Sequence, residues 1–272
     1  MTVWVGTSGW QYRDWRGAFY PAGLATARWL EHYASTFPTV EANSTFYRLP
    51  EAATFDQWAA RTPERFTFAL KASRYLTHVR RLRDPAPPVG RLLERATGLG
   101  PKLGPVLVQL PPTLTADPGL LDAALAAFPS GVRVAFEPRH ASWDADAVGD
   151  VLAAHDAARC WWDRRGAHGP LVRTASWCYL RLHEGRATPA PGYGDRALRS
   201  WAERLATTWG DDADGYVYCN NDAHACAPRD AATFTRLAAR VGLRCALAGG
   251  EAPVPGRTTA RRTAWPRAAQ RR

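Results

Sequence analysis

Paired cysteines and long apolar runs are both scarce in this sequence, and each scarcity argues against a class of protein. The five cysteines are odd in number, irregularly spaced and never form a CxxC pair, which argues against a disulfide framework and for a reducing compartment. No apolar run approaches the roughly 20 residues of a membrane-spanning helix, so we expect no membrane partner. The first residues run straight into a strand-like segment without a basic leader, so we expect a cytoplasmic protein without a signal peptide.

Several familiar motif signatures are missing as well. Gly98, Gly100 and Gly104 have the wrong spacing for a dinucleotide fingerprint and precede a strand-like segment, so we expect no dinucleotide cofactor. Ser8 lies in Gly-Thr-Ser-Gly rather than in GxSxG before a helix, which makes it a poor candidate nucleophile. The sequence contains no HExxH zinc signature.

The net charge is +10, and half of it lies near the end of the chain. Residues 251–272 contain six arginines and one glutamate, with little periodic apolarity. We therefore predict one domain over residues 1–248 and a basic, disordered tail over 249–272. An electrostatic arm for nucleic acid is the alternative interpretation of this tail.

Apolar segments that resemble buried strands alternate with amphipathic segments along residues 1–248. The predicted strands cover residues 3–7, 38–43, 66–71, 105–110, 132–137, 158–162, 177–183 and 215–221. Helical spacing of apolar residues predicts helices over 29–37, 91–97, 117–128, 142–152, 195–209 and 228–241. Alternation of this kind implies parallel strands, and eight of them in this length predict an α/β fold of the (β/α)₈ TIM-barrel type.

An open doubly wound sheet is the alternative fold. One irregularity is visible between the sixth and seventh predicted strands. Only about 14 residues join them, and these include Gly166, Gly169 and Pro170. We therefore expect this connection to be short and to lack a full helix.

Polar side chains follow nearly every predicted strand at its carboxyl end, which is where parallel barrels carry their chemistry. The strand interiors are mostly apolar by contrast, so this clustering predicts a site at one rim of the barrel. Four of these residues are candidate catalytic groups: Glu41, Glu137, His140 and His183. Nine others are candidate ligand-binding groups: Asn43, Tyr47, Lys71, Gln109, Arg139, Trp143, Arg181, Asn220 and Asn221.

Each of these candidates has a structural alternative. Glu41 can have the purely structural role of pairing with Lys71 or with an arginine inside the barrel. Glu137 can likewise form a simple ion pair with Arg139 at the rim. A divalent metal is a further hypothesis, with ligands drawn from Glu41, Glu137, His140, His183 and Asp163. The sequence disfavours the metal because it offers no local ligand signature.

Several motifs resemble the domain-of-unknown-function 72 family, also called YecE-like. They are Gly6–Trp10, Phe19–Pro21, Thr39–Tyr47, Phe66–Lys71 with Thr77-His78, Val108–Pro112, Glu137–His140 with Ser142-Trp143, Tyr179–His183 and Asn220–Asp222. The resemblance covers about residues 3–241 and implies a barrel, in agreement with the periodicity. It implies no particular reaction.

Three functions are open at this point. The first is an enzyme that acts on a phosphorylated or sugar-like anionic small molecule, with Lys71, Arg139 and Arg181 holding the anion. The second is a protein that binds nucleic acid or processes phosphodiesters, in the manner of endonuclease IV-like barrels. The third is a non-catalytic sensor of a small molecule.

Overall fold

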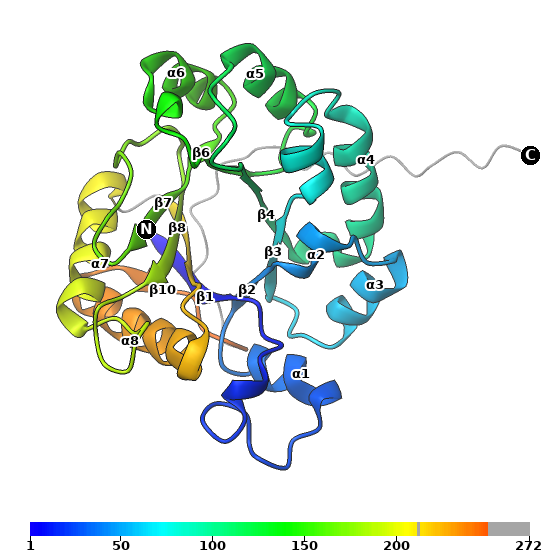
Figure 1. Ribbon diagram of the computed structural model, residues 1–272. Helices are drawn as coiled ribbons and strands as arrows, with labels where there is room; N and C mark the ends of the chain where they lie inside the picture. Colours follow the sequence, from blue (N-terminus) through cyan, green and yellow to red (C-terminus); the bar gives the residue numbers. More distant parts are fainter. Residues whose placement is uncertain (211–212, 250–272) are drawn as a thin grey trace, which may run out of the picture.

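The strands of this protein form a ring that is surrounded by helices (Figure 1). The computed structural model describes residues 1–210 and 213–249. Apart from Gly249, the predicted basic tail over 249–272 therefore lies outside the described residues. The fold is α/β and of the TIM-barrel type, as the alternation of apolar segments predicted.

Within the described ranges, every strand pairing is parallel. The strands are Thr2–Ser8 (β1), Thr39–Ala42 (β2), Thr67–Lys71 (β3), Leu103–Gln109 (β4), Val134–Glu137 (β5), Ala158–Arg159 (β6), Trp161–Arg164 (β7), Cys178–Glu184 (β8), Asp214–Cys219 (β9) and Arg244–Cys245 (β10). Their order around the sheet is β6-β5-β4-β3-β2-β1-β9-β8-β7, and β10 pairs with the start of β1. All eight predicted strands are present, and β10 is an additional short one.

The segment that completes the ring was predicted as one strand over residues 158–162, and the structure divides it into β6 and β7. Its first half, β6, pairs with β5, and its second half, β7, pairs with β8. Between the halves, the Cys160 N–H donates to the Phe136 carbonyl at 2.8 Å. Because β6 and β7 are consecutive in the chain, the sheet has no pair of free edges, and the open doubly wound alternative is excluded.

The helices lie outside the ring, as expected for right-handed crossovers between parallel strands. They are Trp29–Ala34 (α1), Ser44–Tyr47 (α2), Ala52–Ala60 (α3), Ala86–Arg95 (α4), Pro118–Ala126 (α5), Asp146–Ala154 (α6), Asp195–Trp209 (α7) and Cys226–Arg240 (α8), with a π-helical turn at Tyr75–Val79 (η3). No helix is present between β7 and β8, which confirms the predicted short connection. None of the helices in the described ranges is long and apolar enough to cross a membrane.

Local sequence signals explain parts of this arrangement. Asp117 caps α5 by accepting a hydrogen bond from the Leu120 N–H at 3.0 Å, as its place before Pro118 predicted. Gly6 lets β1 approach β2, because a Cβ there would lie only 2.1 Å from the Thr39 carbonyl oxygen. Helices α2 and α3 were not anticipated from the sequence.

Two apolar layers stabilise the barrel. The larger layer lies between strands and helices and includes Val40, Leu70 and Phe234. The smaller layer includes Trp177, Tyr179 and Tyr218, which pack with Ala69 and Ala135 of other strands. Small residues on some strands make room for aromatic ones on others, which is a common way to fill a parallel barrel.

Candidate functional site

A buried arginine joins two carboxylates at the carboxyl ends of three strands. Arg181 of β8 donates to Glu41 of β2 and to Glu137 of β5, each at 2.7 Å. Both carboxylates are fully buried and Arg181 is 1% exposed. Three of the predicted strand-end residues thus converge here, because the closed ring brings β2, β5 and β8 around one centre.

The remaining oxygens of these carboxylates also have donors. The Tyr179 hydroxyl donates to the second Glu41 oxygen at 2.6 Å, whereas the Gln109 amide donates at 3.0 Å to the Glu137 oxygen that also binds Arg181. Arg139 forms a second ion pair with Glu137 at 2.5 Å. All four carboxylate oxygens are therefore hydrogen-bonded, which is what buried charges require.

The ion pairs fix the protonation state of this cluster. Burial alone raises the pKa of Glu137, but Arg181, His183 and Arg139 outweigh burial and hold that pKa well below its usual range. Burial alone would lower the pKa of Arg181, and the two glutamates instead raise it. Glu137 and Arg181 therefore stay charged at neutral pH.

His183 connects this cluster to the last strand of the ring. With the Asn220 amide donating to Nδ1 at 2.8 Å, the hydrogen on Nε2 is free to donate to Glu137 at 3.1 Å. Burial lowers the pKa of His183, although its contact with Glu137 opposes this. His183 is thus a neutral imidazole whose orientation is fixed from both sides.

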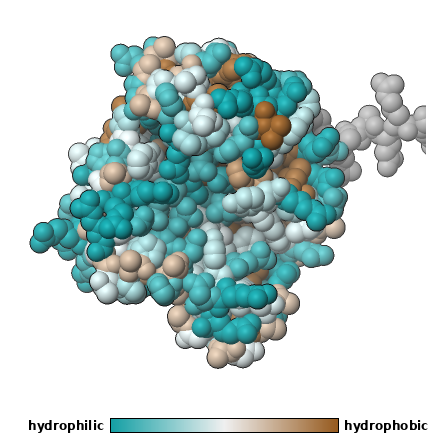
Figure 2. Space-filling view, viewed as in Figure 1, coloured by the Kyte–Doolittle hydropathy of each residue, from teal (hydrophilic) through white to brown (hydrophobic). Residues whose placement is uncertain are grey.

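A hollow of about 360 Å³ lies at the strand ends beside this cluster. We call it the strand-end hollow, and its lining residues are Tyr12, Asn43, Tyr47, Lys71, Gln109, Arg139, Arg164, Arg181, His183, Asn220 and Asp222. On the face seen in Figure 2, hydrophilic residues gather around the middle of the barrel. Eight of the thirteen residues predicted for the site therefore line one cavity, and Glu41 and Glu137 bind Arg181 in its wall.

Lys71 differs from the other cations of the hollow. Its Nζ lies 4.4 Å from the centre of the Phe46 ring, and within the described residues it has no carboxylate within ion-pair distance. Burial, with a further effect of Arg181, lowers the pKa of Lys71 to about 8. Of the two pairings considered for Glu41, the one with an arginine forms and the one with Lys71 does not, because Arg181 and Tyr179 occupy Glu41.

Asp222 also lines the hollow, although it was not among the predicted site residues. Its Oδ1 is buried and has no hydrogen-bond partner, and the Trp15 ring N–H holds its backbone carbonyl at 2.9 Å. Burial raises the pKa of Asp222 to about 7, although Tyr12 and Arg181 partly oppose this. The rule of polar strand ends could have found it, since it follows Asn220 and Asn221 after β9.

Tyr12 and Arg164 also line the hollow without having been named as site residues. Tyr12 reaches it from the loop after β1, where its hydroxyl donates to the Ser8 carbonyl at 2.5 Å. Arg164 is the last residue of β7, a strand whose end was placed too early in the sequence analysis. An error of two residues in a strand boundary was enough to miss it.

Three candidate residues lie away from the lining of the hollow. His140 folds back onto its own segment, where its Nδ1 accepts from the Ser142 N–H at 3.2 Å. Trp143 is buried, with its ring N–H donating to the Leu114 carbonyl at 2.8 Å. Asn221 points toward α8 and donates to Asp230 at 2.7 Å. Each therefore has a local partner, although the buried Oδ1 of Asn221 has none.

The described residues bring no three potential metal ligands together. Of the ligands in the metal hypothesis, Asp163 instead accepts hydrogen bonds from the Tyr193 hydroxyl and the Trp201 ring N–H. Glu41 and Glu137 face Arg181, whose positive charge occupies the place that a cation would take. The donor set of this cluster therefore does not fit a divalent metal.

Comparisons with known proteins agree with this architecture. The UPF0759 protein YunF of Bacillus subtilis is 35% identical over 75 residues, which are 28% of this chain and 26% of YunF. The UPF0759 protein YecE of Escherichia coli is 31% identical over 111 residues, which are 41% of this chain and 38% of YecE. The matched stretches thus cover less than half the length of these curated relatives.

Solved structures match over a larger share of the chain. A DUF72 family protein from Thermotoga maritima is 26% identical with a TM-score of 0.74, over 87% of this chain and 99% of that one. A DUF72 family protein from Enterococcus faecalis has 18% identity and a TM-score of 0.71, over 87% and 95% of the two chains, and shows the fold alone. A family model described as "Protein of unknown function DUF72" matches residues 4–254. Since that match covers most of the sequence, the chain belongs to the DUF72 family.

Proposed function

We propose that this protein is an enzyme that acts on a phosphorylated or sugar-like anionic small molecule, bound in the strand-end hollow. The observation that carries the proposal is Lys71, a mostly buried cation that lines the hollow and has no carboxylate partner. A buried charge without a partner is costly, and an anionic ligand would offset that cost.

The charge balance of the hollow supports an anion. Four basic side chains line it, from Lys71, Arg139, Arg164 and Arg181. They face three carboxyl groups, of which Glu41 and Glu137 are saturated by hydrogen bonds and Asp222 titrates near neutrality. The excess of positive charge therefore has no protein partner, and a ligand with one or two negative charges would neutralise it.

The uncharged groups of the hollow fit the hydroxyls of a sugar-like molecule. Asn43 has a buried Oδ1 with no hydrogen-bond partner. Gln109 and Asn220 add amide groups on two other strands. Amide side chains both donate and accept, as hydroxyls do, and a volume of about 360 Å³ lies in the range of small-molecule sites.

We assign the proton-transfer step to Asp222. A carboxyl group with a pKa of about 7 exchanges protons readily at neutral pH, and Asp222 lines the hollow with an Oδ1 that has no hydrogen-bond partner. Glu41 and Glu137, which were the sequence-based candidates for this step, instead hold Arg181 in place. Their oxygens are occupied, and the pKa of Glu137 is too low for a base that works near neutrality.

The anion-binding part is tested with inorganic sulfate and phosphate by isothermal titration calorimetry. We expect saturable binding to the unaltered protein and a loss of at least tenfold in affinity for Lys71→Met. Arg240→Met is the matched control, because it removes one exposed charge at the far end of α8. Equal affinities of the unaltered protein and Lys71→Met for both ions would contradict the proposal.

The catalytic part is tested with a panel of sugar phosphates, followed by phosphorus NMR. We expect at least one of them to be converted, and Asp222→Asn to slow that conversion by about a hundredfold. Binding of inorganic phosphate to Asp222→Asn should stay within threefold of the unaltered protein. Binding without any conversion would instead identify a sensor and would overturn the enzymatic assignment.

A further inference from the structure

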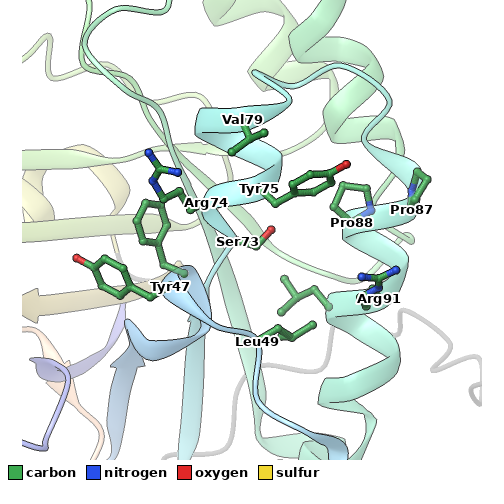
Figure 3. A pocket seen from close by; sticks show the side chains of 11 residues that line it. Tyr47, Leu49, Ser73, Arg74, Tyr75, Val79, Pro87, Pro88 and Arg91 are labelled. Carbon is green, nitrogen blue, oxygen red and sulfur yellow. The ribbon is translucent and has the colours of Figure 1, made fainter.

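A second cavity of about 460 Å³ lies next to the strand-end hollow. We call it the side groove, and its lining residues are Phe46, Tyr47, Leu49, Ser73, Arg74, Tyr75, Val79, Pro87, Pro88, Arg91 and Leu92. Figure 3 shows Tyr47 on the side of the barrel strands, whereas Pro87, Pro88 and Arg91 come from α4 on the opposite side. The π-helical turn η3, which carries Tyr75 and Val79, lies between them.

The side groove gathers most of the exposed apolar side chains. Five large hydrophobic side chains are exposed in the described ranges, and three of them line this groove: Tyr47 (80%), Val79 (54%) and Tyr75 (53%). The other two, Val172 and Leu247, are not part of it. A concentration of exposed apolar surface in one concave place is typical of a binding site.

The groove adjoins the strand-end hollow at two consecutive residues. Tyr47 lines both cavities. Phe46 lines the groove, and its ring lies 4.4 Å from the Nζ of Lys71, which lines the hollow. A small molecule whose anion contacts Lys71 would therefore reach the groove with its other end.

We propose that the side groove binds an aromatic group that is attached to the anion held in the hollow, so that the substrate is an aromatic phosphate or a similar aryl-bearing anion. This inference rests on the proposed function and narrows its substrate class. The groove is the larger of the two cavities, and a cavity of about 150 Å³ already holds benzene, so it has room for a fused pair of rings.

The side chains of the groove favour a flat, electron-rich group over an aliphatic chain. Tyr47 and Tyr75 offer ring faces and edges for stacking. Arg74 and Arg91 are exposed in the groove, and no ion pair with a carboxylate is formed by either one within the described residues. Guanidinium groups in this position bind the face of an aromatic ring.

The test compares methyl phosphate with 1-naphthyl phosphate, two probes that share the anion and differ in the aromatic group. Affinities are measured by calorimetry on the full chain. We expect 1-naphthyl phosphate to bind at least tenfold more tightly. Tyr75→Ala and Val79→Ser should each weaken 1-naphthyl phosphate by at least fivefold and leave methyl phosphate within twofold.

Two controls separate the parts of this inference. Val172→Ser removes an exposed valine outside the groove and should change neither affinity. Lys71→Met should weaken both probes, because it removes the cation that they share.

The outcomes distinguish this inference from the proposed function. If methyl phosphate binds in a Lys71-dependent manner but 1-naphthyl phosphate binds no better, the aromatic groove is overturned and the anion site stands. If neither probe binds, the proposed function fails, and the inference fails with it. Sedimentation velocity tests whether a second copy of this chain occupies the groove instead. A dimer that Tyr75→Ala converts to a monomer would overturn the inference.

Discussion

The two ends of the barrel carry charged side chains in different ways. At the amino ends of the strands, Arg133 pairs with Asp214 at 2.7 Å, donates to the Tyr216 hydroxyl at 3.2 Å and lies over the Trp177 ring. At the carboxyl ends, Arg181 pairs with Glu41 and Glu137 at full burial. Both ends thus contain an arginine held by carboxylate and aromatic partners.

The difference lies in what remains after these pairs have formed. The cluster around Arg133 has matched partners, and none of its residues lines the strand-end hollow or the side groove. The carboxyl end has Lys71 without a carboxylate and Asp222 with an unpartnered oxygen, and both line the strand-end hollow. A matched ion pair contributes to the stability of the fold, whereas unmatched polar groups around a cavity indicate a ligand.

The largest expected effect comes from breaking the two arginine clusters in turn. Arg181→Met leaves two buried glutamates without their main partner and should lower the free energy of unfolding by about 3–5 kcal/mol. Arg133→Met should cost only about 1 kcal/mol, because the Arg133 side chain is 37% exposed and its ion pair is partly solvated. Urea unfolding followed by circular dichroism measures both values.

A compensating variant controls for a chain that simply fails to fold. Adding Glu41→Gln and Glu137→Gln to Arg181→Met removes the buried negative charges and should restore part of the lost stability. Equal losses for Arg181→Met and Arg133→Met would show that the two ends do not differ in this respect.

The next effect concerns the contribution of Asp222 to the stability of the fold as a function of pH. Its pKa is raised by burial from 3.8 to about 7, so the folded state binds a proton that the unfolded state releases between these values. The stabilisation from Asp222 is therefore fully present below about pH 4 and is lost as the pH rises through 7. Asp222→Asn should gain on the order of 4 kcal/mol relative to the unaltered protein between pH 4 and pH 8.

Urea midpoints at a series of pH values give this difference. Asp150→Asn, at an exposed position of α6, is the matched control and should follow the curve of the unaltered protein. A constant difference between Asp222→Asn and the unaltered protein would mean that Asp222 is ionised throughout this range.

The smallest expected effect is the pH dependence of sulfate binding, chosen because sulfate keeps its charge. Burial lowers the pKa of Lys71 to about 8, so its positive charge is lost above that pH. The affinity for sulfate should fall by up to about tenfold per pH unit between pH 8 and pH 10. Lys71→Arg should keep its affinity up to pH 10, because a guanidinium stays charged there. A flat profile for the unaltered protein would remove Lys71 from the anion site.

Much of the fold could be predicted because it depends on local patterns. Apolar runs marked the strands, and Asp117 before Pro118 marked the start of α5. The break at Cys160 could not be predicted from local sequence. It arises because β6 pairs with β5 whereas β7 pairs with β8, and both partners are distant in the chain. Helix α3 was missed because its burial is limited to residues such as Phe55 and Trp58, which left a weak periodic signal.

The sequence predicted which residues would gather at the candidate site, and it predicted much less about how they pair. The rule that polar residues gather at strand ends led to Glu41, Lys71, Glu137 and Arg181. It gave no means of deciding that Glu41 pairs with Arg181 rather than with Lys71, since the two basic groups lie on different strands. That choice sets which cation remains for a ligand.

By itself, the sequence determined the alternation of strands and helices, the lack of a helix between β7 and β8, and the chemical types at the strand ends. These follow from residue type and spacing along the chain. The tertiary structure decided which charges are matched, which polar atoms lack partners, and that the side groove adjoins the strand-end hollow. Those properties depend on distances between residues far apart in sequence, such as Glu41 and Arg181, which only the closure of the ring brings to 2.7 Å.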